Sequence, residues 1–85
     1  MMKLKNMNTL SVEETQWGGK IIAEWNNKEV GSLKYHRGLD NRNRIEVSSI
    51  YVAEPFRPFD VEEQMCKHLN KMFKRRKYII TYKYL

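Results

Sequence analysis

Residues 45–77 decide the fold, and they read IEVSSIYVAEPFRPFDVEEQMCKHLNKMFKRRK. Residues 45–52 are rich in Val and Ile, which favours a β-strand. Alternation gives that strand two faces, with Ile45, Val47, Ser49 and Tyr51 on one and Glu46, Ser48, Ile50 and Val52 on the other. Pro55 and Pro58 follow and end the strand.

The sequence predicts an amphipathic helix after this strand. Asp60 suits the N-cap position, with Glu63 three residues later. Acidic residues in the first turn and the basic run 74–77 in the last both match the helix dipole. The apolar residues that recur at helical spacing are Val61, Met65, Leu69, Met72 and Phe73. Lys67, Lys71 and Lys74 recur at i, i+4 and i+7, so we expect them on the opposite side of the helix.

Two further strands are predicted before this unit and one after it. Residues 21–25 and 30–35 form a hairpin around the turn 26–28, because asparagine tolerates a positive φ, and Gly31 marks a candidate bulge. Residues 78–84 form the last strand. The structure of residues 1–16 is left undecided by the sequence. Residues 1–10 are compatible with a short strand or a tail. Residues 11–14 resemble the start of a helix, which Trp17, Gly18 and Gly19 would end.

The resulting class is α+β, an antiparallel β-meander followed by a β-α-β unit. If the two strands of that unit pair, the connection is a right-handed parallel crossover. A length of 85 residues indicates a single domain, 1–85, with the β-β-β-α-β core in residues 18–85.

Composition excludes several classes of protein. One cysteine leaves no internal disulfide framework and agrees with a reducing, cytoplasmic compartment. No stretch of about 18 apolar residues is present, and residues 1–10 contain no secretory apolar region. With two histidines and one cysteine we expect no structural zinc, and we expect no cofactor.

The positive charge is concentrated near the C-terminus. The net charge is +6, yet residues 1–66 hold nine basic and ten acidic groups, and no acidic residue follows Glu63. This asymmetry favours a polyanionic partner: nucleic acid first, an acidic protein second and an anionic membrane surface third. A face that only improves solubility is the remaining alternative.

The candidate nucleic-acid site combines this charge with aromatic rings. Its members are Lys67, Lys71, Lys74, Arg75, Arg76, Lys77, Tyr78 and Lys83. Lysine and arginine neutralise phosphates, and tyrosine rings stack on unpaired bases. RNA is preferred over duplex DNA because no helix-turn-helix or zinc-finger pattern is present. The tyrosines at 78, 82 and 84 serve either as stacking residues or as core, and arginines 37, 42 and 44 extend the patch if their loop lies on the same side.

Catalytic patterns are weak. Cys66 and His68 are two residues apart on a helix and point to different faces, which argues against a Cys–His dyad and for a buried thiol. His36 is expected at the surface, and no pair of carboxylates has a catalytic spacing. We therefore expect a protein that is not an enzyme.

Residues 49–57, SIYVAEPFR, resemble the GCN5-related acetyltransferase family. In that family a strand ending in a Val-x-Pro-x-x-Arg-like run leads into a glycine-rich phosphate loop and a helix, and the order of elements over residues 18–82 is similar. The resemblance implies a scaffold like half of an acetyltransferase fold. The family motif, Arg/Gln-x-x-Gly-x-Gly/Ala, cradles the pyrophosphate of acetyl-CoA at a helix N-terminus.

Residues 57–62, RPFDVE, depart from that motif. Both glycine positions are acidic, Pro58 removes one donor, and Asp60 as N-cap would occupy the N–H groups that a phosphate needs. We expect a degenerate scaffold without acetyl transfer. Arg57 is the one residue that matches, and we include it in the candidate nucleic-acid site.

The small size, the basic C-terminal part and the abundance of Lys, Asn, Ile and Tyr resemble small phage counter-defence proteins. Among them are T-even-type inhibitors of an RNA-cleaving toxin. That resemblance implies RNA binding, a homodimer, and RNA-dependent sequestration of a toxin endoribonuclease. The alternative is a protein-only inhibitor or adaptor that docks on an acidic protein surface. A small sheet with an uncovered edge also favours a homodimer.

Overall fold

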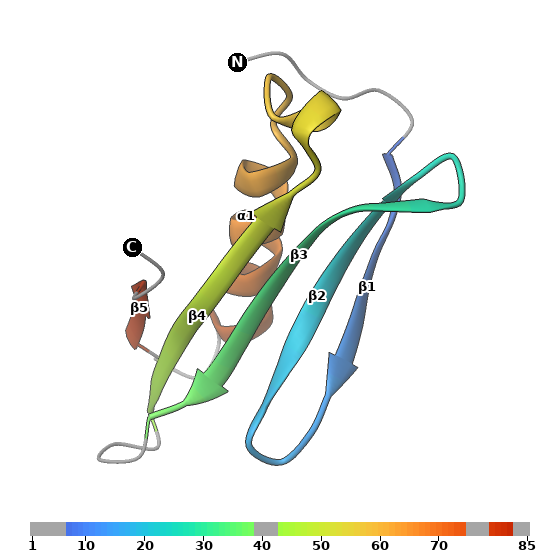
Figure 1. Cartoon of the computed structure of the whole chain (residues 1–85). Coiled ribbons are helices and arrows are strands. Elements are labelled where there is room, and N and C mark those ends of the chain that lie inside the picture. Colours follow the sequence, from blue (N-terminus) through green and yellow to red (C-terminus); the bar gives the residue numbers. More distant parts are fainter. Residues whose placement is uncertain (1–6, 39–42, 75–78, 83–85) are drawn as a thin grey trace.

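The computed structural model describes residues 7–38, 43–74 and 79–82. It contains one five-stranded sheet with one α-helix packed on it (Figure 1). In chain order the elements are β1 (Met7–Glu14), β2 (Gly18–Trp25), β3 (Lys28–Arg37), β4 (Arg44–Val52), the 3₁₀ turn η1 (Glu54–Phe56), α1 (Val61–Phe73) and β5 (Ile79–Tyr82). The strands lie side by side in the same order, which confirms the α+β class.

The first four strands form an antiparallel meander. Three of them, β2 to β4, are the predicted ones, and β1 adds a fourth strand where the sequence left residues 1–16 open. The β2–β3 hairpin turns at Asn26 and Asn27, whose φ angles are 53° and 63°. Asparagine is the side chain that best tolerates this left-handed region in a two-residue turn. The predicted turn at 26–28 is confirmed, with Lys28 already paired with Trp25.

The connection from β4 through α1 to β5 is the predicted parallel crossover. β5 pairs with β4 from Arg44↔Ile79 to Val47↔Tyr82. Because these strands are parallel, β5 begins at the end of the sheet where β4 begins and where α1 finishes (Figure 1). The second half of α1 therefore lies at the same end of the molecule as the β3–β4 connection.

The core lies between α1 and one face of the sheet. Val61, Met65, Leu69 and Phe73 are buried, as their spacing predicts, and Met72 is partly buried. The helix packs on β2, β3 and β4. The buried strand residues of this core are Ile21, Ala23, Val30, Leu33, Tyr35, Ile45 and Val47. No helix in the described part of the chain has the length and apolarity needed to cross a membrane.

The expectation of a helix start at residues 11–14 is wrong. These residues belong to β1, which pairs with β2 from Met7↔Trp25 to Glu14↔Gly19. Leu10 and Val12 alternate along β1 and pack against the core. The capping-box spacing is a local signal, and the strand pairing with β2 overrides it.

The predicted faces of β4 hold only for its first half. Lys34 pairs with Ser49 and Tyr35 pairs with Val47, so Ser48 is an extra residue, a β-bulge. Beyond the bulge the alternation is reversed. Ile50 and Val52 pack against the core, whereas Tyr51, expected on the same face as Ile45, is 54% exposed.

The ends of α1 also differ in detail from the prediction. Asp60 occupies the N-cap position, but its side chain makes no capping hydrogen bond. Instead, its Oδ1 accepts a hydrogen bond from Nε2 of Gln64 at 2.9 Å. The helix ends at Phe73 with Lys74 as C-cap, and the rest of the predicted last turn, 75–77, lies outside the described residues.

Gly31 allows α1 and β4 to approach β3 closely. A Cβ at this position would lie 3.0 Å from the carbonyl oxygen of Tyr51, 3.0 Å from Cγ1 of Val61 and 3.2 Å from Cε of Met65. One of these atoms is backbone, and the other two belong to buried side chains. The position therefore has little room for a larger residue.

We predict that Gly31→Val lowers the free energy of unfolding by about 1–3 kcal/mol, because overpacking would push α1 or β4 away. Urea denaturation measures the change. Ser49→Val adds a side chain on the exposed face of β4 and should stay within about 0.5 kcal/mol of the unsubstituted protein. Equal effects of the two substitutions would contradict the close approach at Gly31.

Tyr35 is a buried aromatic residue with an unsatisfied polar end. It is 4% exposed, and its ring meets that of Phe73 edge-on at 5.7 Å. Its hydroxyl finds no hydrogen-bond partner among the described residues. Burial raises the pKa of Tyr35 from 10.0 to about 12; Glu14 adds to this rise and Arg37 opposes it.

We predict that the buried phenol makes stability fall at alkaline pH. The unfolded chain ionises this group near pH 10.0 and the folded chain near 12, so the contribution to stability is complete below 10.0 and is lost as pH rises towards 12. The unfolding free energy of Tyr35→Phe should equal or exceed that of the unsubstituted protein at pH 7, since a buried, unpaired hydroxyl is removed. Measured from pH 8 to 11, the variant should lose less stability; parallel curves would refute this assignment.

Candidate nucleic-acid interface

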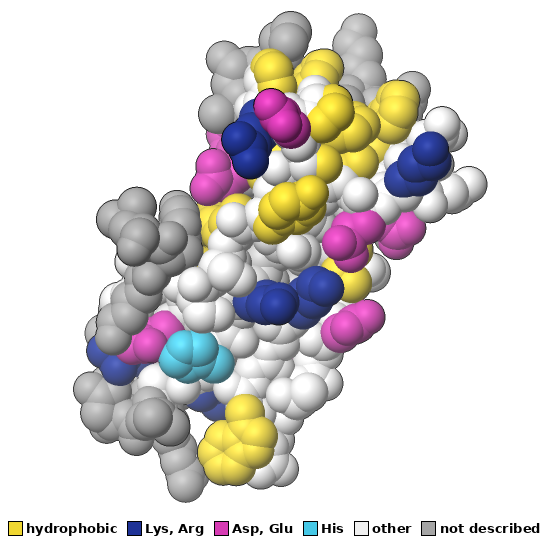
Figure 2. All heavy atoms as spheres, in the orientation of Figure 1, with side chains coloured by type: hydrophobic (Ala, Val, Ile, Leu, Met, Phe, Trp, Pro, Cys, Tyr) yellow, Lys and Arg dark blue, Asp and Glu magenta, His cyan; other side chains and the backbone are white. Residues whose placement is uncertain are grey.

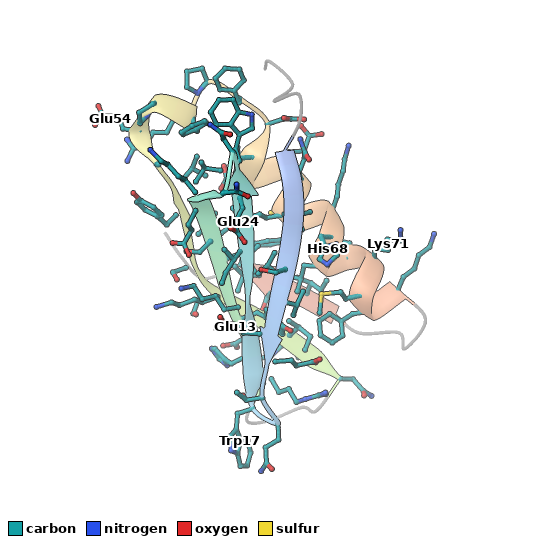
Figure 3. All side chains as sticks on the ribbon, turned by 90° about the vertical axis from the view of Figure 1, so that its right-hand side faces the viewer. Glu13, Trp17, Glu24, Glu54, His68 and Lys71 are labelled. Atoms are coloured by element: carbon teal, nitrogen blue, oxygen red, sulfur yellow. The ribbon has the colours of Figure 1, made fainter. Side chains whose placement is uncertain are left out.

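Three lysines lie along the exposed side of α1. Lys67, Lys71 and Lys74 are all exposed, because the apolar stripe of α1 is turned towards the sheet. Figure 3 shows Lys71 on the side of the helix away from the strands. Lys67 Nζ lies 3.2 Å from Oε1 of Glu63, in an exposed i,i+4 pair that holds little energy. Within the described part of the chain, Lys71 and Lys74 have no ion-pair partner.

A hollow of about 740 Å³ opens between the second half of α1 and β5. The described residues that line it are Lys67, Asn70, Lys71, Phe73, Lys74 and Ile80. The four polar residues come from α1 and its C-cap, Lys74. Phe73 and Ile80 belong to the hydrophobic core or pack against it, so they form an apolar floor below a cationic rim. Ile80 reaches this position because the crossover places it beside Ile45 in the sheet.

A second, smaller hollow lies on the other side of the same lysines. It has a volume of about 250 Å³ and is lined by Leu10, Gln64, Lys67, His68 and Lys71. Figure 3 shows His68 on the side of α1 that faces β1. Lys67 and Lys71 line both hollows, so they form a cationic ridge with a recess on each side.

The structure brings only part of the predicted set together. Lys67, Lys71 and Lys74 share one surface, whereas Arg57 follows η1 at the opposite end of α1. Its Nε donates a hydrogen bond to the carbonyl oxygen of Val52 at 3.4 Å, and it lines a separate hollow of about 370 Å³. The other predicted members lie outside the described residues: Arg75, Arg76, Lys77, Tyr78 and Lys83.

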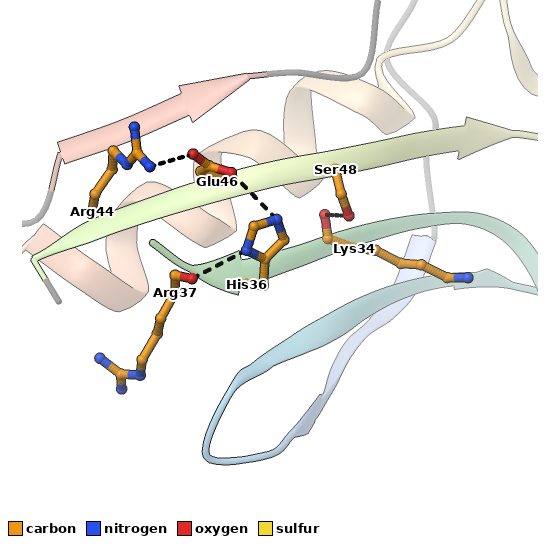
Figure 4. Close-up of polar contacts among 6 residues, drawn as sticks. All are labelled: Lys34, His36, Arg37, Arg44, Glu46 and Ser48. Carbon is orange, nitrogen blue, oxygen red and sulfur yellow. Dashed lines mark hydrogen bonds and ion pairs between the residues drawn. The ribbon is translucent and has the colours of Figure 1, made fainter. Parts of the chain in front are cut away.

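A polar cluster on the uncovered face of the sheet was missed by the sequence analysis (Figure 4). Glu46 is only 6% exposed and faces an arginine and a histidine. Its Oε1 lies 2.6 Å from Nη2 of Arg44, and its Oε2 lies 3.4 Å from Nε2 of His36. Nδ1 of that histidine lies 3.1 Å from the carbonyl oxygen of Arg37. The pairing His36↔Glu46 depends on the strand register, which sequence spacing does not contain.

This cluster limits how far the cationic surface extends. Arg37 and Arg44 lie at the end of the sheet where α1 finishes, as the hypothesis of an extended patch required. However, the carboxylate of Glu46 neutralises the charge of Arg44. Figure 2 shows the sheet face opposite α1, where basic, acidic and hydrophobic side chains are mixed and no cationic area stands out. Among the described residues the cationic surface therefore lies on the helix side, and Arg42, the third arginine of the expected extension, lies outside them.

Cys66 and His68 are separated, as the helix geometry predicts. Cys66 packs against the core and lies near Tyr82 of β5, whereas His68 faces the β1 side. Burial raises the pKa of the Cys66 thiol, and a hydrogen bond with Tyr82 partly offsets the rise. Tyr82 is 40% exposed, so this ring is neither full core nor fully available for stacking. Among the described residues, no group of three or more His, Cys, Asp or Glu side chains could hold a metal ion.

Comparison with solved structures shows the fold of acetyltransferases. An aminoglycoside acetyltransferase from an uncultured soil metagenomic sample aligns with a TM-score of 0.70 and 15% identity over 82% of this chain and 49% of its own. A second one, in complex with sisomicin, aligns with a TM-score of 0.70 and 11% identity over 91% of this chain and 59% of its own. A possible acetyltransferase from Clostridium difficile 630 aligns with a TM-score of 0.69 and 12% identity over 82% and 49%.

The chain therefore spans about half the length of these proteins, and it shares their fold over that part. The expected likeness to half of an acetyltransferase fold is confirmed. No protein-family model matches the sequence. No curated protein matches it either.

The residues at the start of α1 do not fit the pyrophosphate of acetyl-CoA. Glu62 and Glu63 stand in the first turn, where a phosphate would need the positive end of the helix dipole. Asp60, 8% exposed, adds a carboxyl group directly before them. Asp60 makes no capping hydrogen bond, so the expected occupation of the N–H groups by its side chain is wrong. Repulsion by the acidic residues of the first turn is the reason that remains.

We predict that acetyl-CoA at about 1 mM leaves the melting temperature unchanged, because any ligand of the native state alone would raise it. Thermal denaturation followed by circular dichroism measures this. A rise of several degrees that disappears in Arg57→Ala would contradict the conclusion that the start of α1 does not fit acetyl-CoA. It would assign the hollow of about 370 Å³ that Arg57 lines to the coenzyme.

Proposed function

We propose that this protein binds RNA through the cationic ridge of α1. The observation that supports the proposal best is the position of Lys67 and Lys71, which line recesses on both sides of the helix. Lys74 continues the same surface at the C-cap. Lysines in a row along the helix can contact successive phosphates of an RNA strand, and the recesses beside them leave space for its sugars and bases.

Charge distribution also supports a polyanionic ligand. In the whole sequence no acidic residue follows Glu63, so the part of the chain after it carries positive charge only. The described residues contain one α-helix, whereas a helix-turn-helix reader of duplex DNA needs two. The proposal is a binding function without catalysis, since the start of α1 carries acidic residues where an acetyltransferase holds its coenzyme.

Two narrower or competing functions are tested by the same experiments. RNA-dependent sequestration of a toxin endoribonuclease requires the RNA binding proposed here. A protein-only inhibitor or adaptor would use the same lysines to dock on an acidic protein surface.

The homodimer also stays a prediction. It would pair an edge of the sheet, and β1 and β5 are the two edge strands of the described sheet.

We predict that Lys71→Ala combined with Lys74→Ala weakens RNA binding and reduces its salt dependence. Each lost phosphate contact should lower the slope of log K against log salt by about 0.7–0.9. The measurement is fluorescence anisotropy with labelled RNA and nuclease-treated protein at several salt concentrations.

The matched control is Lys28→Ala combined with Lys34→Ala. It removes the same charge from exposed positions on β3, away from the ridge. Binding and slope should stay close to those of the unsubstituted protein. Equal losses in the two double variants would show attraction by net charge alone, and no binding at low salt would refute the proposal and favour the acidic protein surface.

A further inference from the structure

The larger hollow differs from a flat cationic patch in one respect. Among the described residues its rim carries three ammonium groups, whereas its floor is apolar: Ile80 is partly buried there, and behind it lies Phe73, which is 5% exposed. A ligand that offers only charge would make no use of an apolar floor. A ligand with phosphates and a flat, weakly hydrated ring would use both. The hollow has a volume of about 740 Å³ and is wide open to solvent, so a ligand can enter it while the rest of its chain stays outside.

Asn70 adds a specific polar group to this hollow. It is exposed on α1 between Lys67 and Lys71 and lines the hollow but not the smaller recess. Its amide presents both a donor and an acceptor, the combination that pairs with the edge of a base. Lysine ammonium groups cannot supply the acceptor half of such a pair.

We propose that the hollow between α1 and β5 receives one unstacked base of a single-stranded RNA. This inference rests on the proposed function. The base lies over Ile80 and the small exposed part of Phe73, Asn70 contacts its edge, and the lysines of the rim hold the flanking phosphates. A base within a duplex is stacked on both faces and paired at its edge, so it cannot enter a recess between a helix and a strand.

The proposal predicts selectivity that a charged surface lacks. The probes are a single-stranded RNA of about 12 nucleotides, a duplex of the same phosphate count, and a strand of the same length without bases. The single strand should bind about fivefold or more tightly than the base-free strand, because only the single strand can place a base against the apolar floor. The duplex should bind no better than the base-free strand.

Substitutions on α1 distinguish the contribution of the base to binding from that of the phosphates. Asn70→Ala should weaken binding of the single strand and leave the base-free strand unaffected, whereas Lys71→Ala should weaken both. Gln16→Ala, an exposed amide in the β1–β2 turn, is the matched control and should change neither. A fluorescent 2-aminopurine in the strand should report unstacking on binding.

The outcomes distinguish the two proposals. No binding of any probe at low salt refutes the RNA-binding function together with this inference. Equal, salt-dependent binding of all three probes supports the cationic ridge and overturns the base in the hollow. Binding of the single strand that is unchanged by Asn70→Ala assigns the selectivity elsewhere and also overturns the inference.

Discussion

Burial of one apolar face of α1 is the constraint on which the rest of the structure depends. Val61, Met65, Leu69 and Phe73 contribute to the single core that the described residues form, and the close approach at Gly31 allows the helix to sit on β3. Once this face is buried, the helical period leaves Lys67, Lys71 and Lys74 no direction but outwards. The packing that stabilises the fold therefore also creates the cationic ridge.

The sequence was most informative where local pattern and tertiary structure agree. The helix stripe, the asparagine turn and the parallel crossover follow from spacing, backbone preference and handedness, and all three are confirmed. Residues 11–14 show the opposite case, because a capping-box spacing is compatible with helix and strand alike. Pairing with β2, which is a contact between segments distant along the chain, decides between them. The bulge at Ser48 has no spacing signal, yet it reverses the faces of the second half of β4.

The same distinction applies to the candidate site. The lysine spacing predicts a cationic stripe, because all three residues lie on one helix. The hollow joins Phe73 and Asn70 of α1 to Ile80 of β5, and that meeting depends on the crossover and its register. The cluster of His36, Arg44 and Glu46 likewise requires the pairing of β3 with β4. Arg57, which a family motif suggested, lies at the far end of α1 and does not join the ridge.

The position of β5 at the edge of the sheet has a consequence for dynamics. In the described sheet β5 pairs with β4 alone, over four residues, and this pairing closes a long loop that includes all of α1. Loop closure costs entropy before the contact rewards it, so we expect β5 to form late and to open at lower free energy than the meander. One wall of the larger hollow belongs to this strand. A ligand held there would bind only while β5 is paired with β4, so it would stabilise that pairing. The backbone amide hydrogens of β5 would then exchange more slowly with solvent when the ligand is bound.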